Sequence, residues 1–204
     1  MNIEQCEANI QAYQYTIAVP HALDANELQL AHEIAGWTHG EHMLPKTPED
    51  ISAFMEQKHS VVIYAHEEPV GHAAITYVYT DKPQVEIGSI VVHPDWRRGK
   101  SVGTVATMAV LEQAKELYPH HTPIALTNPQ SRSLVVSMGA KEMDTAAVDK
   151  EAWVFCDTCP KKPIQPENGT IVCCDTPYDL SPLQYPENLF YQLWVSLKIG
   201  LQEK

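Results

Sequence analysis

Three runs of apolar residues in the middle of the chain predict neighbouring β-strands. They are residues 60–65 (SVVIYA), 70–80 (VGHAAITYVYT) and 85–93 (VEIGSIVVH). The polar turns HEEP and DKP separate the runs, and such short turns favour antiparallel hairpins. A further strand is expected over residues 13–19. The pattern therefore predicts a largely antiparallel sheet.

Segments whose apolar residues have helical spacing precede and follow these strands along the chain. One helix is predicted from Asp24, because Asp24 and Glu27 form a capping box ahead of an apolar face. A second helix is predicted from Thr47, which precedes a proline at the first helical position. After the strands, residues 101–117 and 128–138 each predict a helix, and the second is closed by a glycine.

The last part of the chain predicts shorter elements. Residues 124–127 and 153–156 are expected as short strands. A strand over residues 170–180 follows a segment rich in proline and lysine. Residues 187–201 carry an apolar stripe typical of a helix. That helix packs either on its own core or against a second copy in a homodimer.

The composition is that of an acidic, folded protein. Hydrophobic residues make up 44%, charged residues 20%, and the formal net charge is −12. The 14 Lys and Arg residues are scattered rather than gathered, which argues against binding to nucleic acid or to an anionic membrane. The acidic surface either attracts a cationic partner or is an ordinary solvated surface. No apolar run approaches the ~20 residues of a membrane helix. The polar N-terminus MNIEQCEANIQ lacks a signal region, so we expect a cytoplasmic protein.

The segment PDWRRGKSVGT, residues 94–104, carries the strongest functional signal. Its centre, Gly99-Lys100-Ser101, is similar to the end of a nucleotide-binding P-loop. Pro94, however, stands where that loop needs its first glycine. The segment also follows an antiparallel hairpin rather than opening a βαβ unit. ATP or GTP binding is therefore not expected.

The same segment is suited to hold a pyrophosphate. Arg97, Arg98 and Lys100 supply positive charge. Gly99 and Gly103 let the backbone come close to a ligand, and the N-terminus of a helix follows with its free N–H groups. The alternative is a basic turn ahead of an ordinary helix.

Residues 85–114 resemble the acetyl-CoA-binding motif of the GNAT superfamily of N-acetyltransferases. In that family a strand ending in V-x-P runs into R/Q-x-x-G-x-G/A and then into a helix. Arg98, Ser101 and Gly103 occupy the three marked positions. Ser101 departs from the usual glycine, and a serine hydroxyl at a helix N-terminus would donate to a phosphate. The order of predicted elements over residues 12–180 also matches the family.

The resemblance implies an α/β (α+β) fold. Its centre is a mixed, mostly antiparallel sheet flanked by helices, with a splay between the strands at 85–93 and 124–127. The acyl-CoA-binding domain would span residues 1–180. Residues 181–204 would form a C-terminal helical extension.

The resemblance also implies which residues bind acetyl-CoA. Backbone groups of Val91 and Val92 would bind the pantetheine arm and the thioester carbonyl, and an amide there would stabilise the oxyanion. Asn128 would bind the pantetheine, is a plain N-cap before Pro129, or does both. The residues that would hold the pyrophosphate are Arg97, Arg98, Gly99, Lys100, Ser101, Val102, Gly103 and Thr104.

Acetyl transfer needs an acceptor amine that has lost its proton. Glu86 is the predicted general base, and the alternative is a structural, hydrogen-bonded carboxylate. The tyrosine that protonates the departing thiolate in this family would stand at Val135, so another group replaces it or the chain has lost catalysis. The loop residues His39, Glu41 and His42 would contact the amine. Their spacing fits no standard metal site, and a solvated loop is the alternative.

Four of the five cysteines cluster late in the chain, in a hairpin insertion predicted over residues 156–174. Cys156 and Cys159 have the C-x-x-C spacing of half a tetrahedral zinc site, and the adjacent pair Cys173 and Cys174 would complete it. Structural zinc, free thiols and a redox disulfide stay open as alternatives.

These observations lead to one principal hypothesis and one alternative. The principal hypothesis is a cytoplasmic N-acetyltransferase that moves an acetyl group from acetyl-CoA to a primary amine of a small molecule or peptide, by direct attack in a ternary complex. The alternative is a non-catalytic acyl-CoA-binding regulatory or interaction module.

Overall fold

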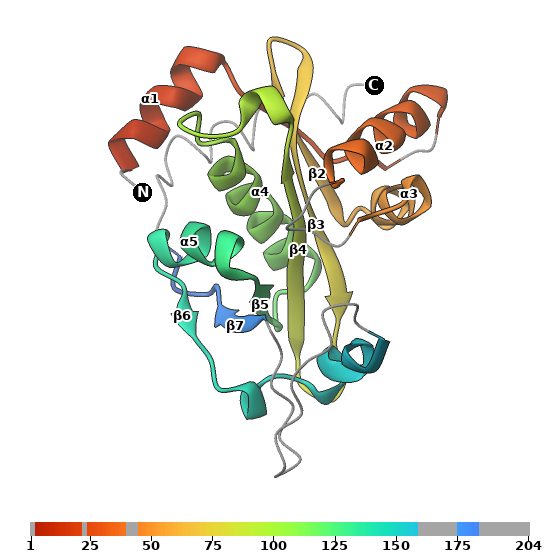
Figure 1. Cartoon of the computed structure of the whole chain (residues 1–204), viewed down its shortest axis with the longest axis vertical. Coiled ribbons are helices and arrows are strands. Elements are labelled where there is room, and N and C mark those ends of the chain that lie inside the picture. The colour runs from red at the N-terminus through yellow and green to blue at the C-terminus, as the bar shows by residue number, and fades with distance from the viewer. Residues whose placement is uncertain (1–2, 22–23, 40–44, 159–174, 184–204) are drawn as a thin grey trace.

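A seven-stranded sheet forms the centre of the protein in the computed structural model, which describes residues 3–21, 24–39, 45–158 and 175–183 (Figure 1). The strand order is β1-β2-β3-β4-β5-β7-β6. Neighbouring strands are antiparallel except β4 and β5, which run parallel. The bounds are β1 Thr16–Ala18, β2 Ser60–Ala65, β3 Glu68–Val78, β4 Gln84–Val92, β5 Thr122–Thr127, β6 Lys141–Glu142 and β7 Thr176–Asp179. The mixed, mostly antiparallel sheet expected from the sequence is confirmed.

Helices cover both faces of this sheet (Figure 1). One core cluster joins residues of α1, α4 and β2–β4, while a second joins α2 and α3 to Val62 and Val91. The capping boxes predicted at Asp24 and Thr47 are both present and begin α2 and α3. The helices are α1 Ile3–Tyr13, α2 Ala25–Trp37, α3 Pro48–Glu56, α4 Val102–Leu117 and α5 Pro129–Ser137. The 3₁₀ helices are η1 Pro94–Trp96, η2 Thr145–Ala147 and η3 Lys150–Thr158.

The predicted splay lies between β4 and β5. The two strands pair only from Gln84 opposite Thr122 to Glu86 opposite Ile124. Beyond that point β4 continues to Val92 and pairs on its other side with β3. Residues 87–92 of β4 therefore have no strand partner on the β5 side among the described residues. We call this stretch the open edge of β4.

A β-bulge at Ser89 bends β4 along its open edge. His72 and Ala74 of β3 stand opposite Val91 and Gly88, so β4 has one extra residue there, and Ser89 has a positive φ of 47°. The fully buried His72 holds the bulge: its Nδ1 donates to the Ser89 carbonyl at 3.1 Å, and its Nε2 accepts from the Ser60 hydroxyl at 2.7 Å. Burial lowers the pKa of His72 to about 4, so this imidazole is neutral at pH 7.

The structure corrects two expectations from the sequence. The segment 13–19 is not one strand: α1 extends to Tyr13, and β1 covers only Thr16–Ala18. Residues 153–156 are not a strand either, because they lie in η3. The segment 170–180 therefore has no strand partner at 153–156, and its described strand β7 pairs with β6 and β5.

Two other expectations fall outside the described residues. The predicted C-terminal helix over 187–201 lies there, and so does most of the predicted insertion over 156–174. The division into a domain over 1–180 and an extension over 181–204 stays a prediction. None of the described helices is long and apolar enough to cross a membrane.

Candidate active site

The open edge of β4 presents backbone groups to one side of the sheet. The N–H of His93 donates to Val70 on the β3 side at 2.9 Å. Successive residues of a strand turn their backbone groups to opposite edges. The backbone N–H and C=O of Val91 therefore point toward β3, and those of Val92 point toward the open edge. The Val92 carbonyl accepts a hydrogen bond from Arg97 Nε at 3.1 Å. The Val92 N–H is thus the donor that this strand end turns toward the splay.

The loop of residues 97–101 joins this strand end to α4, and its backbone is unusual. The φ angles of Arg98, Gly99 and Ser101 are 69°, 72° and 60°, in the left-handed region. Ser101 is the N-cap of α4 but makes no side-chain capping bond, so its side chain does not compete for the N–H groups of the first turn. Successive N–H groups in such a loop form a concavity suited to an anion.

The start of α4 lies directly against the sheet. Val102 is buried, and a Cβ at Gly71 of β3 would clash with Val102 Cγ1. A Cβ at Gly103 would instead meet only ordinary contacts at 3.6 Å and 3.7 Å, which agrees with the Gly/Ala alternation of the motif. Thr104 is buried in the same turn. Gly71 thus lets the N-terminus of α4 approach the end of β4.

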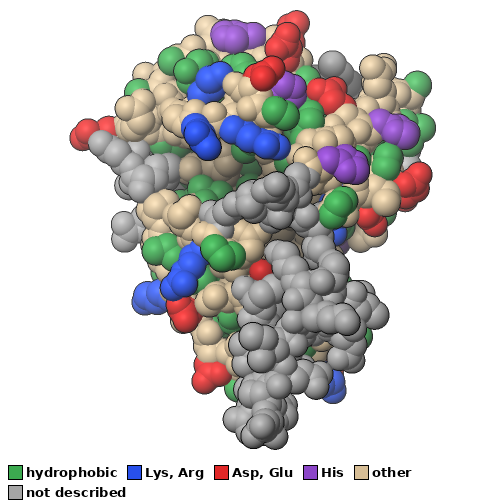
Figure 2. All heavy atoms as spheres, viewed as in Figure 1, with side chains coloured by type: hydrophobic (Ala, Val, Ile, Leu, Met, Phe, Trp, Pro, Cys, Tyr) green, Lys and Arg blue, Asp and Glu red, His purple; other side chains and the backbone are tan. Residues whose placement is uncertain are grey.

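The three loop cations have different surroundings. Arg97 donates to the carbonyls of Val92 and Trp37, so it ties β4 to the end of α2. Lys100 Nζ donates to the Asp95 carbonyl and lies 4.2 Å above the Trp96 ring. Arg98 is exposed and makes no hydrogen bond or ion pair with another described residue. Figure 2 shows Lys and Arg side chains gathered in the upper part of the view, over the loop that precedes α4.

Two residues from the N-terminal segment also contact this loop. Asn9 Nδ2 donates to the Gly99 carbonyl and to Ser101 Oγ, both at 2.9 Å. The Tyr15 hydroxyl donates to the Lys100 carbonyl at 2.7 Å. Ser101 Oγ, which the sequence suggests as a phosphate donor, is therefore turned toward α1.

Glu86 lies at the point where β4 and β5 separate. It is half-buried, and its carboxylate accepts a hydrogen bond from the Tyr79 hydroxyl, while the Thr76 hydroxyl donates to the Glu86 backbone carbonyl at 3.4 Å. Burial raises the pKa of Glu86, and hydrogen bonding by Tyr79 and Thr76 lowers it by less. Burial and the adjacent carboxylate both raise the pKa of Tyr79. The pair is a carboxylate with increased proton affinity that is held by a neutral phenol.

Neither Val135 nor Ser137 of α5 takes the place of the tyrosine that serves as the acid in this family. Val135 is buried in the core cluster beside α4. Ser137, two residues further along, donates its hydroxyl to the Leu134 carbonyl. Asn128 Oδ1 accepts from the Ser131 backbone N–H at 3.0 Å, as expected of an N-cap, and its contact with the pantetheine stays a prediction.

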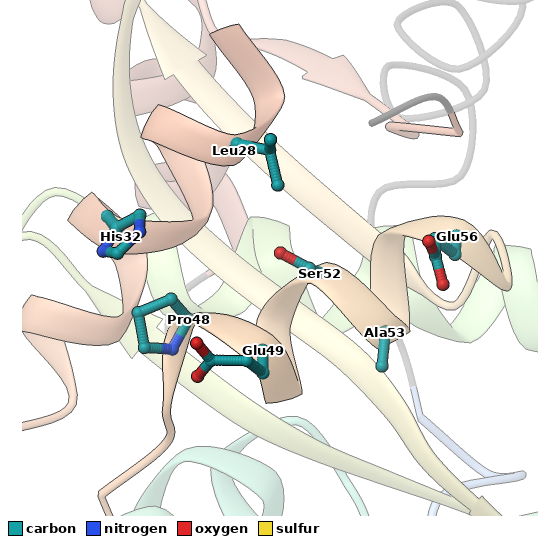
Figure 3. A pocket seen from close by; sticks show the side chains of 7 residues that line it. All are labelled: Leu28, His32, Pro48, Glu49, Ser52, Ala53 and Glu56. Carbon is teal, nitrogen blue, oxygen red and sulfur yellow. The ribbon is translucent and has the colours of Figure 1, made fainter. Parts of the chain in front are cut away.

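The predicted acceptor residues are only partly described. His39 is exposed just after α2, while Glu41 and His42 lie outside the described residues. A shallow pocket of about 300 Å³ lies between α2 and α3 (Figure 3). Its lining contains none of the predicted site residues. The lining side chains are Leu28, His32, Pro48, Glu49, Ser52, Ala53 and Glu56.

The proposed zinc ligands also fall largely outside the described part of the chain. The backbone of Cys156 lies in η3, and Cys159, Cys173 and Cys174 are not described. Within the described ranges no group of three or more His, Cys, Asp or Glu residues is arranged to hold a metal ion. Structural zinc at the four cysteines stays a prediction.

The sequence matches the acetyltransferase (GNAT) family over residues 26–139, more than half of the chain. The chain belongs to this family. The match includes the strands that splay, the 97–101 loop and α4, so the resemblance seen in the motif is confirmed. The family is one of acetyltransferases. No curated protein sequence matches the chain.

Solved structures show the same fold at low sequence identity. N-acetylglutamate synthase from Neisseria gonorrhoeae, complexed with coenzyme A and N-acetyl-glutamate, is 12% identical with a TM-score of 0.58 over 80% of this chain. This chain covers only 34% of that synthase. Rv2747 from Mycobacterium tuberculosis, in complex with CoA and NLQ, is 13% identical with a TM-score of 0.55, covering 79% of this chain and 96% of that one. An acetyltransferase from Streptococcus agalactiae is 15% identical with a TM-score of 0.54, covering 80% and 96%.

Sequence reasoning missed three residues that the structure brings to the site. Tyr79 lies within the predicted strand 70–80, but the sequence does not show that its hydroxyl meets Glu86. Asn9 and Tyr15 belong to a segment that gave no motif. The spacing of Cys6, Ile10 and Tyr13 was the available signal for a helix there.

Proposed function

We propose that this protein transfers the acetyl group of acetyl-CoA to a primary amine of a small molecule or peptide by direct attack. The observation that carries the proposal is the open edge of β4, which ends at the N-terminus of α4 and the 97–101 loop. An extended pantetheine arm can pair with such an edge as a missing strand does, while the pyrophosphate meets the loop. Family membership and the CoA-bound relatives support this arrangement.

The pyrophosphate end is assigned to donors at the start of α4. The Arg98 side chain and the N–H groups of the loop and first helical turn would hold its oxygens. Arg97 and Lys100 have a different task, because their side chains are engaged with backbone carbonyls. They would fix the loop, and Arg98 would supply the charge-assisted contact.

The reacting end is assigned to the open edge and to Glu86. The deprotonated amine attacks the thioester carbon, a C–N bond forms, and the carbonyl oxygen becomes an oxyanion that the Val92 N–H stabilises. Breaking of the C–S bond then releases CoA as a thiolate. Glu86 accepts the amine proton. Because a strand rises about 3.3 Å per residue, Glu86 lies about 20 Å along β4 from Val92, and the proton reaches it along a chain of several water molecules. Since the side chain of Val135 has no acidic proton to give, the thiolate is protonated by water.

Calorimetric titration with acetyl-CoA, with Mg-ATP as the control ligand, tests the donor site. Acetyl-CoA should bind and Mg-ATP should not. Release of CoA in the presence of a panel of primary amines then tests transfer. Absence of acetyl-CoA binding contradicts the proposal as a whole.

The second candidate is an acyl-CoA-binding module without turnover, and the buried Val135 is the observation that favours it. It predicts binding of acetyl-CoA with only background CoA release for every amine. Amine-dependent release above background excludes it.

A further inference from the structure

The N-terminal segment makes three hydrogen bonds to three consecutive residues of the 97–101 loop. Asn9, only 6% exposed, uses both amide hydrogens, one on the Gly99 carbonyl and one on Ser101 Oγ. The Tyr15 hydroxyl binds the Lys100 carbonyl between them. Gln5 Nε2 donates to Asn9 Oδ1 at 3.1 Å and so fixes the orientation of the Asn9 amide.

These contacts decide which way the loop turns its N–H groups. In a trans peptide unit the C=O and the following N–H point in opposite directions. Because the carbonyls of Gly99 and Lys100 are held toward the N-terminal segment, the N–H groups of Lys100 and Ser101 point away from it. That is the orientation an anion-binding concavity requires.

The loop needs such external support because its own conformation is unfavourable. Arg98 and Ser101 have side chains that disfavour the left-handed φ angles they adopt. Aromatic packing adds a second attachment: the ring of Trp96, just before the loop, lies 5.3 Å from that of Tyr13 in an edge-on arrangement. Lys100 Nζ lies above the same Trp96 ring.

We propose that α1 and Tyr15 form a clamp that holds the 97–101 loop in its anion-binding conformation, with Asn9 as the central positioning residue. This inference rests on the proposed acetyl-CoA site. It gives a reason for the serine at position 101: its hydroxyl is the acceptor for Asn9, where the usual glycine would offer none. Asn9 acts through the loop and is not assigned a contact with the ligand.

Calorimetry with CoA on the full-length protein tests the clamp. Asn9→Ala should raise the Kd for CoA about tenfold, which corresponds to about 1.4 kcal/mol, with unchanged stoichiometry. The stoichiometry matters because a partly unfolded sample lowers it without raising Kd. Gln11→Ala, at an exposed position of the same helix, is the matched control and should leave Kd unchanged. An Asn9→Ala protein that binds CoA like the wild type overturns the clamp.

Tyr15→Phe keeps the test decisive if Asn9→Ala does not fold, and a double-mutant cycle sharpens it if Asn9→Ala folds. Tyr15→Phe retains the ring and removes only the hydroxyl, and it should also weaken CoA binding. Ser101→Ala combined with Asn9→Ala should cost less than the sum of the two single changes, because both remove the same hydrogen bond. Additive effects, or wild-type Kd in Tyr15→Phe, contradict the clamp.

Hydrogen exchange without ligand separates this inference from the proposed function. The amides of residues 97–104 should exchange faster in Asn9→Ala than in the wild type or in Gln11→Ala. If the wild type does not bind CoA, the proposed function fails whatever the exchange result. If the wild type binds CoA and exchange is unchanged in Asn9→Ala, the clamp fails and the proposed function stands.

Discussion

The two ends of the proposed site are stabilised in different ways. The backbone of the 97–101 loop is held by hydrogen bonds from the side chains of Asn9 and Tyr15. Its own Arg97 side chain adds a hydrogen bond to the Val92 carbonyl. Glu86, at the other end of the open edge, is held through its own side chain by the Tyr79 hydroxyl and by burial. The loop thus offers a set of backbone N–H donors. The point where β4 and β5 separate offers instead a single carboxylate with a raised pKa.

Because the two ends are stabilised independently, a mutation at one end should leave the function of the other end intact. Changes at the loop should alter the affinity for CoA and leave the proton-transfer step intact. Changes at Glu86 should alter turnover and its pH dependence and leave CoA affinity intact. Variants at each end of the site test that separation.

Removing the carboxylate of Glu86 should have the largest effect on the rate of transfer. Glu86→Gln keeps the size of the side chain and an acceptor for Tyr79, and it should lower kcat about 10²- to 10⁴-fold, the usual contribution of a general base. Steady-state kinetics with a responsive amine measures it, and calorimetry should show an unchanged Kd for CoA. Glu68→Gln, at an exposed position of β3, is the control. If Glu86→Gln instead raises the Kd for CoA and leaves kcat normal, Glu86 acts in CoA binding and not as the general base.

Reversing the loop charge should have the largest effect on affinity. Arg98→Glu replaces a charge-assisted donor by a repelling carboxylate and should raise the Kd for CoA about 100-fold or more. The melting temperature should not change, because Arg98 makes no ion pair or hydrogen bond with another described residue. Lys115→Glu, at the far end of α4, is the charge-matched control. Unchanged affinity in Arg98→Glu refutes the assignment of the loop.

Crowding the approach of α4 to the sheet should affect stability and affinity together. In Gly71→Ala the added methyl group clashes with Val102, and overpacking of this kind costs about 1–3 kcal/mol. Urea unfolding should show that loss, and calorimetry should show weaker CoA binding. Gly36→Ala, where a methyl group meets nothing within 4 Å, should not destabilise the protein. Wild-type affinity in a destabilised Gly71→Ala would show that the position of α4 does not control the site.

The smallest expected effect is a shift in pH dependence. The Tyr79 hydrogen bond favours the ionised carboxylate and lowers the pKa of Glu86. Tyr79→Phe removes it, so the pKa of Glu86 should rise and the acid limb of the profile of kcat against pH should move to higher pH. Tyr118→Phe, which removes a hydroxyl bound to His59, is the control for loss of a phenol. An acid limb that moves to lower pH, or does not move, contradicts the base role of the pair.

Raised proton affinity at Glu86 also fixes the sign of its contribution to folding. The folded state binds this proton more tightly than the unfolded state does. Its contribution to the free energy of unfolding therefore falls as pH rises from the ordinary pKa of glutamate to the raised value. The buried His72 behaves in the other direction. Its pKa of about 4 lies below the ordinary value, so its contribution rises with pH between about 4 and 6.5.

Local signals in the sequence predicted most of the central elements correctly. The apolar runs at 60–65 and 85–93 match β2 and β4 closely, and the capping residues Asp24 and Thr47 begin the helices predicted from them. These signals work because a strand alternation or a helix cap depends on residues a few positions apart. The η3 segment was misread because a short apolar run does not distinguish a strand from a helical turn.

The sequence alone predicts the order of the elements from α2 to α5, the motif ahead of α4 and the resemblance to the family. Three features follow from tertiary packing: Arg97 and Lys100 are engaged with backbone carbonyls, Val92 rather than Val91 turns its N–H to the open edge, and Tyr79 holds Glu86. The contacts of Asn9 with Gly99 and Ser101 span 90 and 92 positions of the chain. Such contacts leave no periodic trace in the sequence, because each depends on how separate elements pack and not on the spacing within one of them.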